Sequence, residues 1–189
     1  MRIYYHPNLK DGSNTYVILD SKTKEAIIVD PCKITEKIIE NIERENYSLS
    51  AILITHNRDA TEEGVSTLRT IYNPQIYSAD SNVIGNDCQM LQGDGLIKVA
   101  SFTISYFALA GHTADSIAFK IGKALFTGDA LLAGVIGKTT NPYSRKLLVT
   151  NIHSKLLTHP DSTVILPCHG PLSTIGIEKK YNLEFGINN

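Results

Sequence analysis

The sequence has few cysteines, and their placement limits what they can build. Only three are present among 189 residues, Cys32, Cys88 and Cys168. An odd number at wide spacing argues against a disulfide framework and against a Cys-x-x-Cys metal knuckle. We therefore expect reduced thiols, as in a cytoplasmic protein.

Excess charge and long apolar runs are also missing. Eighteen Lys and Arg residues nearly balance nineteen Asp and Glu residues, so neither a polyanion-binding surface nor an acidic tail is indicated. No stretch approaches the roughly 20 apolar residues that span a bilayer, and the amino terminus lacks a leader pattern. These absences predict a cytoplasmic protein that binds neither nucleic acid nor membrane, and they leave its oligomeric state open.

The chain has the length and apolar content for one buried core. At 189 residues with 42% hydrophobic content, it predicts a single domain over residues 1–189. Short β-rich runs and turns fill the first thirty residues, and apolar periodicity then predicts helices at 34–46, from 65, around 148–156 and at 175–182. Strands are expected at 51–54, 96–99, 102–109, 116–121, 124–126 and 163–166. This order predicts an α/β fold with two halves, each a sheet with helices against it.

Four potential metal ligands follow apolar strands in this pattern. They are His56, His112, Asp129 and His169, and three of them lie beside glycines, in Gly111-His112, Gly128-Asp129 and His169-Gly170. Imidazole and carboxylate groups at strand ends can converge on one cleft although they lie far apart in sequence. Together, in this order, they indicate a metal-dependent active site.

These segments give the chain a resemblance to the metallo-β-lactamase superfamily, and within it to the glyoxalase II-like (hydroxyacylglutathione hydrolase-like) thioester hydrolases. The resemblance implies a four-layer αββα sandwich with two mixed sheets flanked by helices. The matching segments are Asn14-Thr15-Tyr16-Val17-Ile18, Ile28-Val29-Asp30-Pro31, Leu53-Ile54-Thr55-His56, Gly111-His112-Thr113-Ala114-Asp115-Ser116, Leu125-Phe126-Thr127-Gly128-Asp129-Ala130-Leu131, and Ile165-Leu166-Pro167-Cys168-His169-Gly170-Pro171 with Thr174-Ile175 and Glu178.

The principal motif of that family, His-x-His-x-Asp-His-x-x-Gly, is degenerate here. Between His56 and Gly64, the second histidine is replaced by Arg58, the aspartate by Ala60 and the third histidine by Thr61. Carried over from the family, the first metal position keeps three ligands, and the second keeps two. The first set is His56, His112 and Asp129, and the second is Asp129 and His169.

Two ligands are too few for a stable second site, because catalytic zinc normally has three protein ligands and one open position. The first position could hold one zinc, iron or manganese ion. Arg58 would repel such an ion at close range, so a metal-free state is the alternative. The loss of the motif's aspartate also removes the group that orients the attacking hydroxide in the family.

Two functions follow from this deficit. One is a weak or specialised hydrolase of a small ester or thioester, with one metal ion and with Asp129 and His56 as catalytic residues. The other is a non-catalytic, metal-free descendant whose cleft binds a ligand or a partner protein.

Arg58 and Lys138 are candidate ligand-binding residues. Arg58 could form a salt bridge to Asp129 in place of the lost metal, could hold an anionic ligand, or could point to solvent. Lys138 matches a basic position after the Gly-Asp segment of glyoxalase II-like proteins, with an ordinary loop lysine as the alternative. For Cys168 we expect a small buried side chain rather than a metal ligand or nucleophile.

Overall fold

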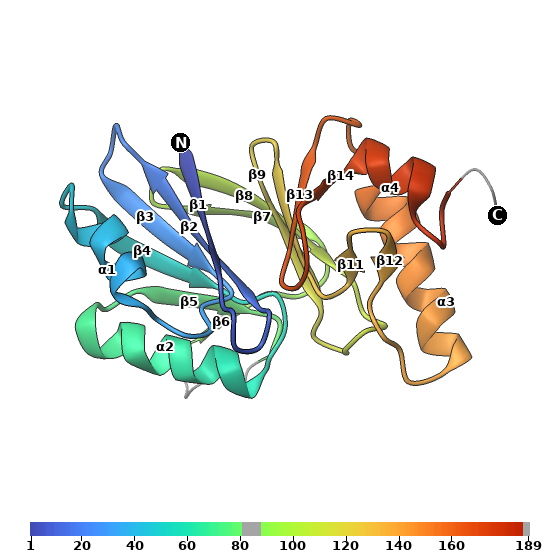
Figure 1. The fold of residues 1–189 in the computed structure, drawn as a ribbon, viewed down its shortest axis with the longest axis horizontal. Helices are drawn as coiled ribbons and strands as arrows, with labels where there is room; N and C mark the ends of the chain where they lie inside the picture. Colours follow the sequence, from blue (N-terminus) through green and yellow to red (C-terminus); the bar gives the residue numbers. More distant parts are fainter. Residues whose placement is uncertain (81–87, 187–189) are drawn as a thin grey trace.

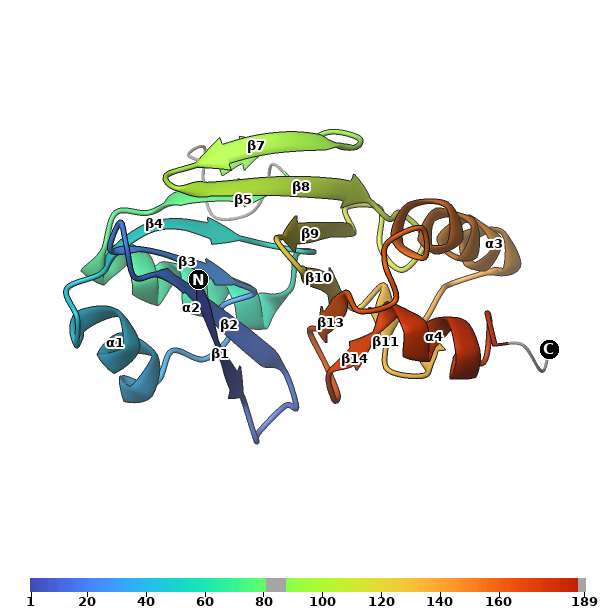
Figure 2. The ribbon, with the colours of Figure 1, turned by 90° about the horizontal axis from the view of Figure 1, so that it is seen from above.

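The fold consists of two β-sheets packed face to face with helices on their outer surfaces (Figures 1 and 2). A computed structural model describes residues 1–80 and 88–186 of the chain. Both sheets are mixed, since each contains parallel and antiparallel strand pairs. The predicted four-layer αββα sandwich is therefore confirmed.

The first sheet comes from the amino-terminal half of the chain and carries α1 and α2 on its outer face (Figure 1). Among the described residues its strand order is β1-β2-β3-β4-β5-β6. The bounds are β1 Arg2–Pro7, β2 Asn14–Asp20, β3 Glu25–Val29, α1 Glu36–Glu43, β4 Ser48–Leu53, α2 Asp59–Ile71, β5 Gln75–Ser78 and β6 Cys88–Met90.

The second sheet comes from the carboxyl-terminal half, with α3 and α4 on its far side (Figure 2). Its order in the described part of the chain is β14-β13-β10-β9-β8-β7. The bounds are β7 Gly95–Val99, β8 Phe102–Ala108, β9 Ile117–Ile121, β10 Ala124–Gly128, α3 Pro142–Asn151, β13 Val164–Pro167, β14 Ser173–Thr174 and α4 Ile175–Tyr181, with a small hairpin of β11 Leu131–Leu132 and β12 Val135–Ile136.

Alternation along the strands separates the layers. In β3, Ile27 and Val29 point into the core between the sheets, while Ala26 and Ile28 face the helices. This two-residue period is expected where both faces of a strand are buried. The same separation gives the second sheet its own outer core, in which Leu148 of α3 takes part.

The predicted helix around 148–156 differs from the observed one in its bounds and its end. It begins at Pro142, because the Asn141 side chain caps it by accepting a hydrogen bond from the Ser144 backbone N–H at 2.9 Å. It then passes into a π-helical turn over Ile152–Leu156. The apolar spacing located the buried face but could not show where the cap lies.

The two sheets meet at the edge where the predicted ligands lie. The Asn14 N–H donates to the Cys168 carbonyl at 2.7 Å, and the Ile117 N–H donates to the Thr55 carbonyl at 2.8 Å. The first bond joins the start of β2 to the segment after β13, and the second joins the loop after β4 to the start of β9. In the part of the chain that the structure describes, no helix has both the length and the apolar character needed to cross a membrane.

Gly64, the last residue of the degenerate motif, sits where α2 crosses the loop after β3. A Cβ at this position would lie 2.2 Å from the Pro31 carbonyl oxygen. We expect Gly64→Ala to lower the free energy of unfolding by about 1–3 kcal/mol, because the clash outweighs the helix propensity that alanine adds. Urea denaturation followed by circular dichroism measures this. Ser66→Ala on the exposed face of α2 is the control, and equal stability of the two variants would contradict the close contact.

Candidate metal centre

The four ligands singled out in the sequence lie together in space. Single ligand atoms of His56, His112 and Asp129 are all within 4.8 Å of one another. The His56 Nε2 atom is 3.5 Å from Asp129 Oδ2, and the His169 Nδ1 atom is 2.7 Å from Asp129 Oδ1. A separation of 3.5 Å suits two ligands that share an ion at bond lengths of about 2.1 Å. Asp129 lies between the two metal positions, as its place in the family motif implies.

His56 is oriented by a chain of hydrogen bonds that begins at a buried carboxylate. The Thr55 hydroxyl donates to Asp30 Oδ2 at 2.7 Å, and the Thr55 N–H donates to Asp30 Oδ1 at 2.8 Å. The same hydroxyl lies 3.2 Å from His56 Nδ1. Its proton is already given to Asp30, so it can only accept from His56. The Nε2 atom of His56 therefore turns its lone pair toward Asp129.

His112 is oriented in the same way by the backbone. Its Nδ1 atom lies 2.7 Å from the Lys138 carbonyl oxygen, which can only accept. Nδ1 therefore donates, and Nε2 keeps its lone pair. Gly137 makes this approach possible, since a Cβ there would lie 2.1 Å from the Asp129 carbonyl oxygen and 3.2 Å from the His112 ring.

The first metal position fits a cation. Lone pairs of His56 and His112 and the carboxylate of Asp129 converge, and such groups repel one another unless a positive charge lies between them. Each imidazole has a hydrogen-bonded partner behind it, an arrangement typical of metal-binding histidines. Two imidazoles and a carboxylate are ligands that zinc, iron and manganese accept.

Asp129 also forms a hydrogen bond with His169, the other residue of the second position. Burial raises the pKa of its carboxyl, but the hydrogen bond from His169 and the electrostatic effect of nearby His56 outweigh this and hold the pKa well below its usual range. The hydrogen bond to Asp129 in turn raises the pKa of His169, while burial and the charge of Arg58 lower it. Asp129 is therefore ionised at neutral pH.

Arg58 points inward and fills the second position. It precedes α2 as the residue at the helix cap. Its Nη2 donates to Cys168 Sγ at 2.8 Å and to Cys32 Sγ at 3.1 Å, and its Nη1 lies 3.3 Å from His169 Nε2. The solvent-facing alternative is therefore wrong. The alternative of a salt bridge to Asp129 is also wrong, because the Asp129 carboxylate contacts His56 and His169 instead.

At the second position, ligand atoms of Asp129, Cys168 and His169 also lie within 4.8 Å of one another, but Arg58 contacts two of these three residues. Guanidinium only donates, so His169 Nε2 must accept from Arg58, and its Nδ1 then donates to Asp129. No lone pair of His169 is left for an ion. Ala60 has no donor atom, and the Thr61 hydroxyl is buried without a hydrogen-bond partner.

Cys32 was missed by the sequence reasoning. Its thiol is buried, and it interacts with the Cys168 thiol as well as with Arg58. The hydrogen bond with Cys168 lowers the pKa of Cys32, burial raises it, and the charge of Arg58 lowers it again, to about 6. Cys168 is fully buried, as expected, and the same hydrogen bond and burial raise its pKa. Wide spacing in sequence concealed the pair.

Asp115 was missed as well. Its carboxylate accepts a hydrogen bond from the Asn57 N–H at 2.6 Å and so ties the loop after His56 to the loop after His112. The available signal was that Asp115 stands where the family motif has glycine. Lys138, by contrast, has an exposed side chain, and only its carbonyl takes part in the site, through His112.

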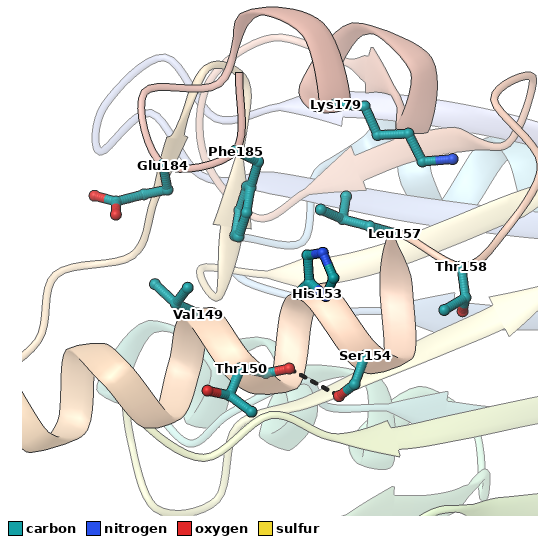
Figure 3. Close-up of a pocket in the computed structure, with 9 residues that line it drawn as sticks. All are labelled: Val149, Thr150, His153, Ser154, Leu157, Thr158, Lys179, Glu184 and Phe185. Atoms are coloured by element: carbon teal, nitrogen blue, oxygen red, sulfur yellow. Dashed lines mark hydrogen bonds between the residues drawn. The ribbon is translucent and has the colours of Figure 1, made fainter. Parts of the chain in front are cut away.

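A separate pocket lies between α3 and the carboxyl-terminal segment (Figure 3). Its volume is about 660 Å³, and Val149, His153, Leu157 and Phe185 are among the residues that line it. None of the candidate ligands borders this pocket. The candidate metal centre and this pocket are therefore distinct features.

Comparison with known proteins agrees with this geometry. The chain is 29% identical to hydroxyacylglutathione hydrolase GloC of Haemophilus influenzae, over 96% of this chain and 97% of that one. It is also 29% identical to a hydroxyacylglutathione hydrolase of Chromohalobacter salexigens, over 82% of this chain but only 60% of that enzyme. The crystal structure of the BLEG-1 B3 metallo-β-lactamase matches with a TM-score of 0.83 and 28% identity, over 96% and 98% of the chains. No family model matches the sequence.

The contact between Arg58 and His169 predicts a measurable pKa change. The charge of Arg58 lowers the pKa of His169, so Arg58→Met should raise it further above the ordinary value. Two-dimensional NMR of the imidazole protons, in protein treated with chelator, measures the titration. Arg69→Met at the far end of α2 is the control. An unchanged or lowered pKa in Arg58→Met would contradict the contact.

Proposed function

Because the chain belongs to the metallo-β-lactamase superfamily, in its glyoxalase II-like branch, we propose that it is a one-metal hydrolase of a small ester or thioester. The observation that carries the proposal is the convergence of His56, His112 and Asp129. In both imidazoles Nδ1 donates to a partner, and the lone pair of Nε2 faces the space between the three residues. Their partners Thr55 and Lys138 hold this arrangement without help from an ion. The hydroxyacylglutathione hydrolases among the relatives support an ester or thioester bond as the one that is hydrolysed.

Each residue has a defined task in this proposal. His56, His112 and Asp129 would hold a zinc, iron or manganese ion. A metal ion bound there lowers the pKa of a water molecule and polarises a carbonyl group. Asp129 stays ionised because His169 and His56 bind it, so it remains a ligand over the physiological pH range.

Arg58 supplies a fixed positive charge at the second position. It contacts His169 and the two thiols rather than His56 or His112, so its charge lies on the far side of Asp129 from the first position. From there the guanidinium can attract the carboxylate of a substrate or an oxyanion that forms in the cleft. Ala60 offers no group to orient water, and we therefore propose slow or specialised hydrolysis.

A second candidate function is metal-free binding of a ligand or partner protein. It is favoured by Arg58 itself, because a guanidinium occupies the position of one metal and the Asp129 carboxylate is already paired with two histidines. Metal analysis separates this function from the first.

Composition adds three further proposals. Balanced charge, with 18 basic and 19 acidic residues, favours a small-molecule substrate over nucleic acid or a membrane surface. Sparse cysteines favour the cytoplasm. A single domain over residues 1–189 is the simplest organisation for two sheets that share one core.

Metal content is the direct test of the one-metal proposal. Protein purified without chelators should contain about one equivalent of a transition metal, and His112→Ala should contain less than about a tenth. Inductively coupled plasma mass spectrometry measures both, and thioester hydrolysis should fall to the buffer rate in the variant. His153→Ala, outside the site, is the control. Less than a tenth of an equivalent in the wild-type protein would exclude the one-metal hydrolase and favour the binding function.

Restoring the motif tests the assignment of the second position. The triple variant Arg58→His, Ala60→Asp, Thr61→His should raise the metal content toward two equivalents and increase thioester hydrolysis, because it replaces the missing ligands and removes the fixed charge. Adding Asp129→Ala to the triple variant should abolish both gains. If neither metal content nor hydrolysis rises, the cleft differs from its relatives at more than these three positions.

A further inference from the structure

Cys32 and Cys168 form a pair of thiols that the proposed hydrolysis does not use. Both sulfur atoms contact the same guanidinium nitrogen, Arg58 Nη2, at 3.1 and 2.8 Å. Their backbones are held by neighbouring residues at the start of β2. The Cys32 N–H donates to the Thr15 hydroxyl at 3.1 Å, and the Cys168 carbonyl accepts from the Asn14 N–H at 2.7 Å.

A negative charge on one of the two thiols would stabilise the guanidinium that lies between them. A buried charge is stable only when it is paired, and Arg58 forms no ion pair with a carboxylate in the described part of the chain. Its hydrogen-bond acceptors are two sulfur atoms and one imidazole nitrogen, and its Nε is buried without a partner. A thiol is a weak acceptor, whereas a thiolate is a strong one. Cys32 is the sulfur whose pKa is lowered, to about 6.

Cys32 is also the cysteine of the pair that lines a pocket. It borders a pocket of about 260 Å³ that Cys168 does not line. Lys10 and Lys33 in this pocket are balanced by Asp11 and Glu63, so the pocket has no preference for an anion. The exposed fraction of Cys32 is only 1%. A small neutral oxidant therefore fits better than a charged or bulky one.

We propose that Cys32 and Cys168 are a reversible redox pair that a hydroperoxide closes into a disulfide. The Cys32 thiolate attacks one oxygen of hydrogen peroxide, the O–O bond breaks, and hydroxide leaves with a sulfenic acid formed on Cys32. The Cys168 sulfur then attacks the Cys32 sulfur, and the sulfenic oxygen leaves as water with the remaining protons. In total, two thiols and one peroxide give one disulfide and two waters.

Disulfide formation changes the environment of Arg58. A disulfide sulfur is neutral, so Arg58 loses its anionic partner and keeps only His169 among its present acceptors. The redox state of the two cysteines therefore changes the net charge around Arg58, next to the rest of the site. A dithiol reductant restores the original contacts.

Thiol counting and peptide mapping test the proposal without any activity assay. After treatment with hydrogen peroxide and alkylation under denaturing conditions, the number of free thiols should fall from three to one. Non-reducing digestion should link the Cys32 peptide to the Cys168 peptide, and dithiothreitol should restore all three thiols. Arg58→Met should slow the reaction by about tenfold or more, because the guanidinium holds the thiolate.

Cysteine variants provide the controls. Cys88→Ala should still lose two thiols, whereas Cys32→Ala and Cys168→Ala should form no intramolecular disulfide. Circular dichroism establishes that each variant is folded. If a variant is not folded, the peptide map of the oxidised wild-type protein alone shows whether Cys32 is linked to Cys168. A linkage that involves Cys88, a sulfinic acid on one cysteine without a disulfide, or three free thiols after oxidation would each overturn the proposal.

Discussion

A buried guanidinium is the constraint on which the rest of the site depends. Arg58 lies among Cys32, Cys168 and His169, and its side chain contacts all three. A permanent positive charge cannot share that space with a metal ion. It also dictates which nitrogen of His169 carries the proton, and through His169 it fixes how Asp129 is bound. One substitution thus determines the protonation and the partners of three neighbouring side chains.

The two halves of the site differ in how much of their support remains. His56 is oriented by the Thr55–Asp30 pair, in which Asp30 is almost fully buried. His112 is oriented by a backbone carbonyl that can approach it because residue 137 is glycine. Such partners orient the imidazoles, and they are typical of histidines whose lone pairs bind a metal ion. The second half has no comparable set of orienting partners, since the side chains of Ala60 and Thr61 carry no charge and form no hydrogen bonds. The surviving support is the physical reason to expect a metal on one side only.

The fold and the first ligand set could be predicted from the sequence, because strand periodicity and local motifs carry that information. His56, His112 and Asp129 each follow a strand, and the sheets bring strand ends together. The direction of Arg58 could not be predicted, because it depends on two sulfur atoms from distant segments. Asp115 was hidden for a similar reason, since its partner is a backbone N–H of another loop. Cytoplasmic location, substrate and single-domain organisation stay predictions, because no contact in the structure bears on them.

The charge on Cys32 links the two halves of the site electrostatically. While Cys32 is a thiolate, it partly offsets the charge of Arg58, and an ion held by His56, His112 and Asp129 is repelled less by the guanidinium. Once the sulfur atoms are joined, the guanidinium charge is uncompensated, and in a buried site it acts on a divalent ion with little screening. Repulsion should then weaken metal binding at the first position, although no ligand has moved. If the proposed metal site and thiol pair are both present, we therefore expect the metal content to be higher in reduced protein than in oxidised protein.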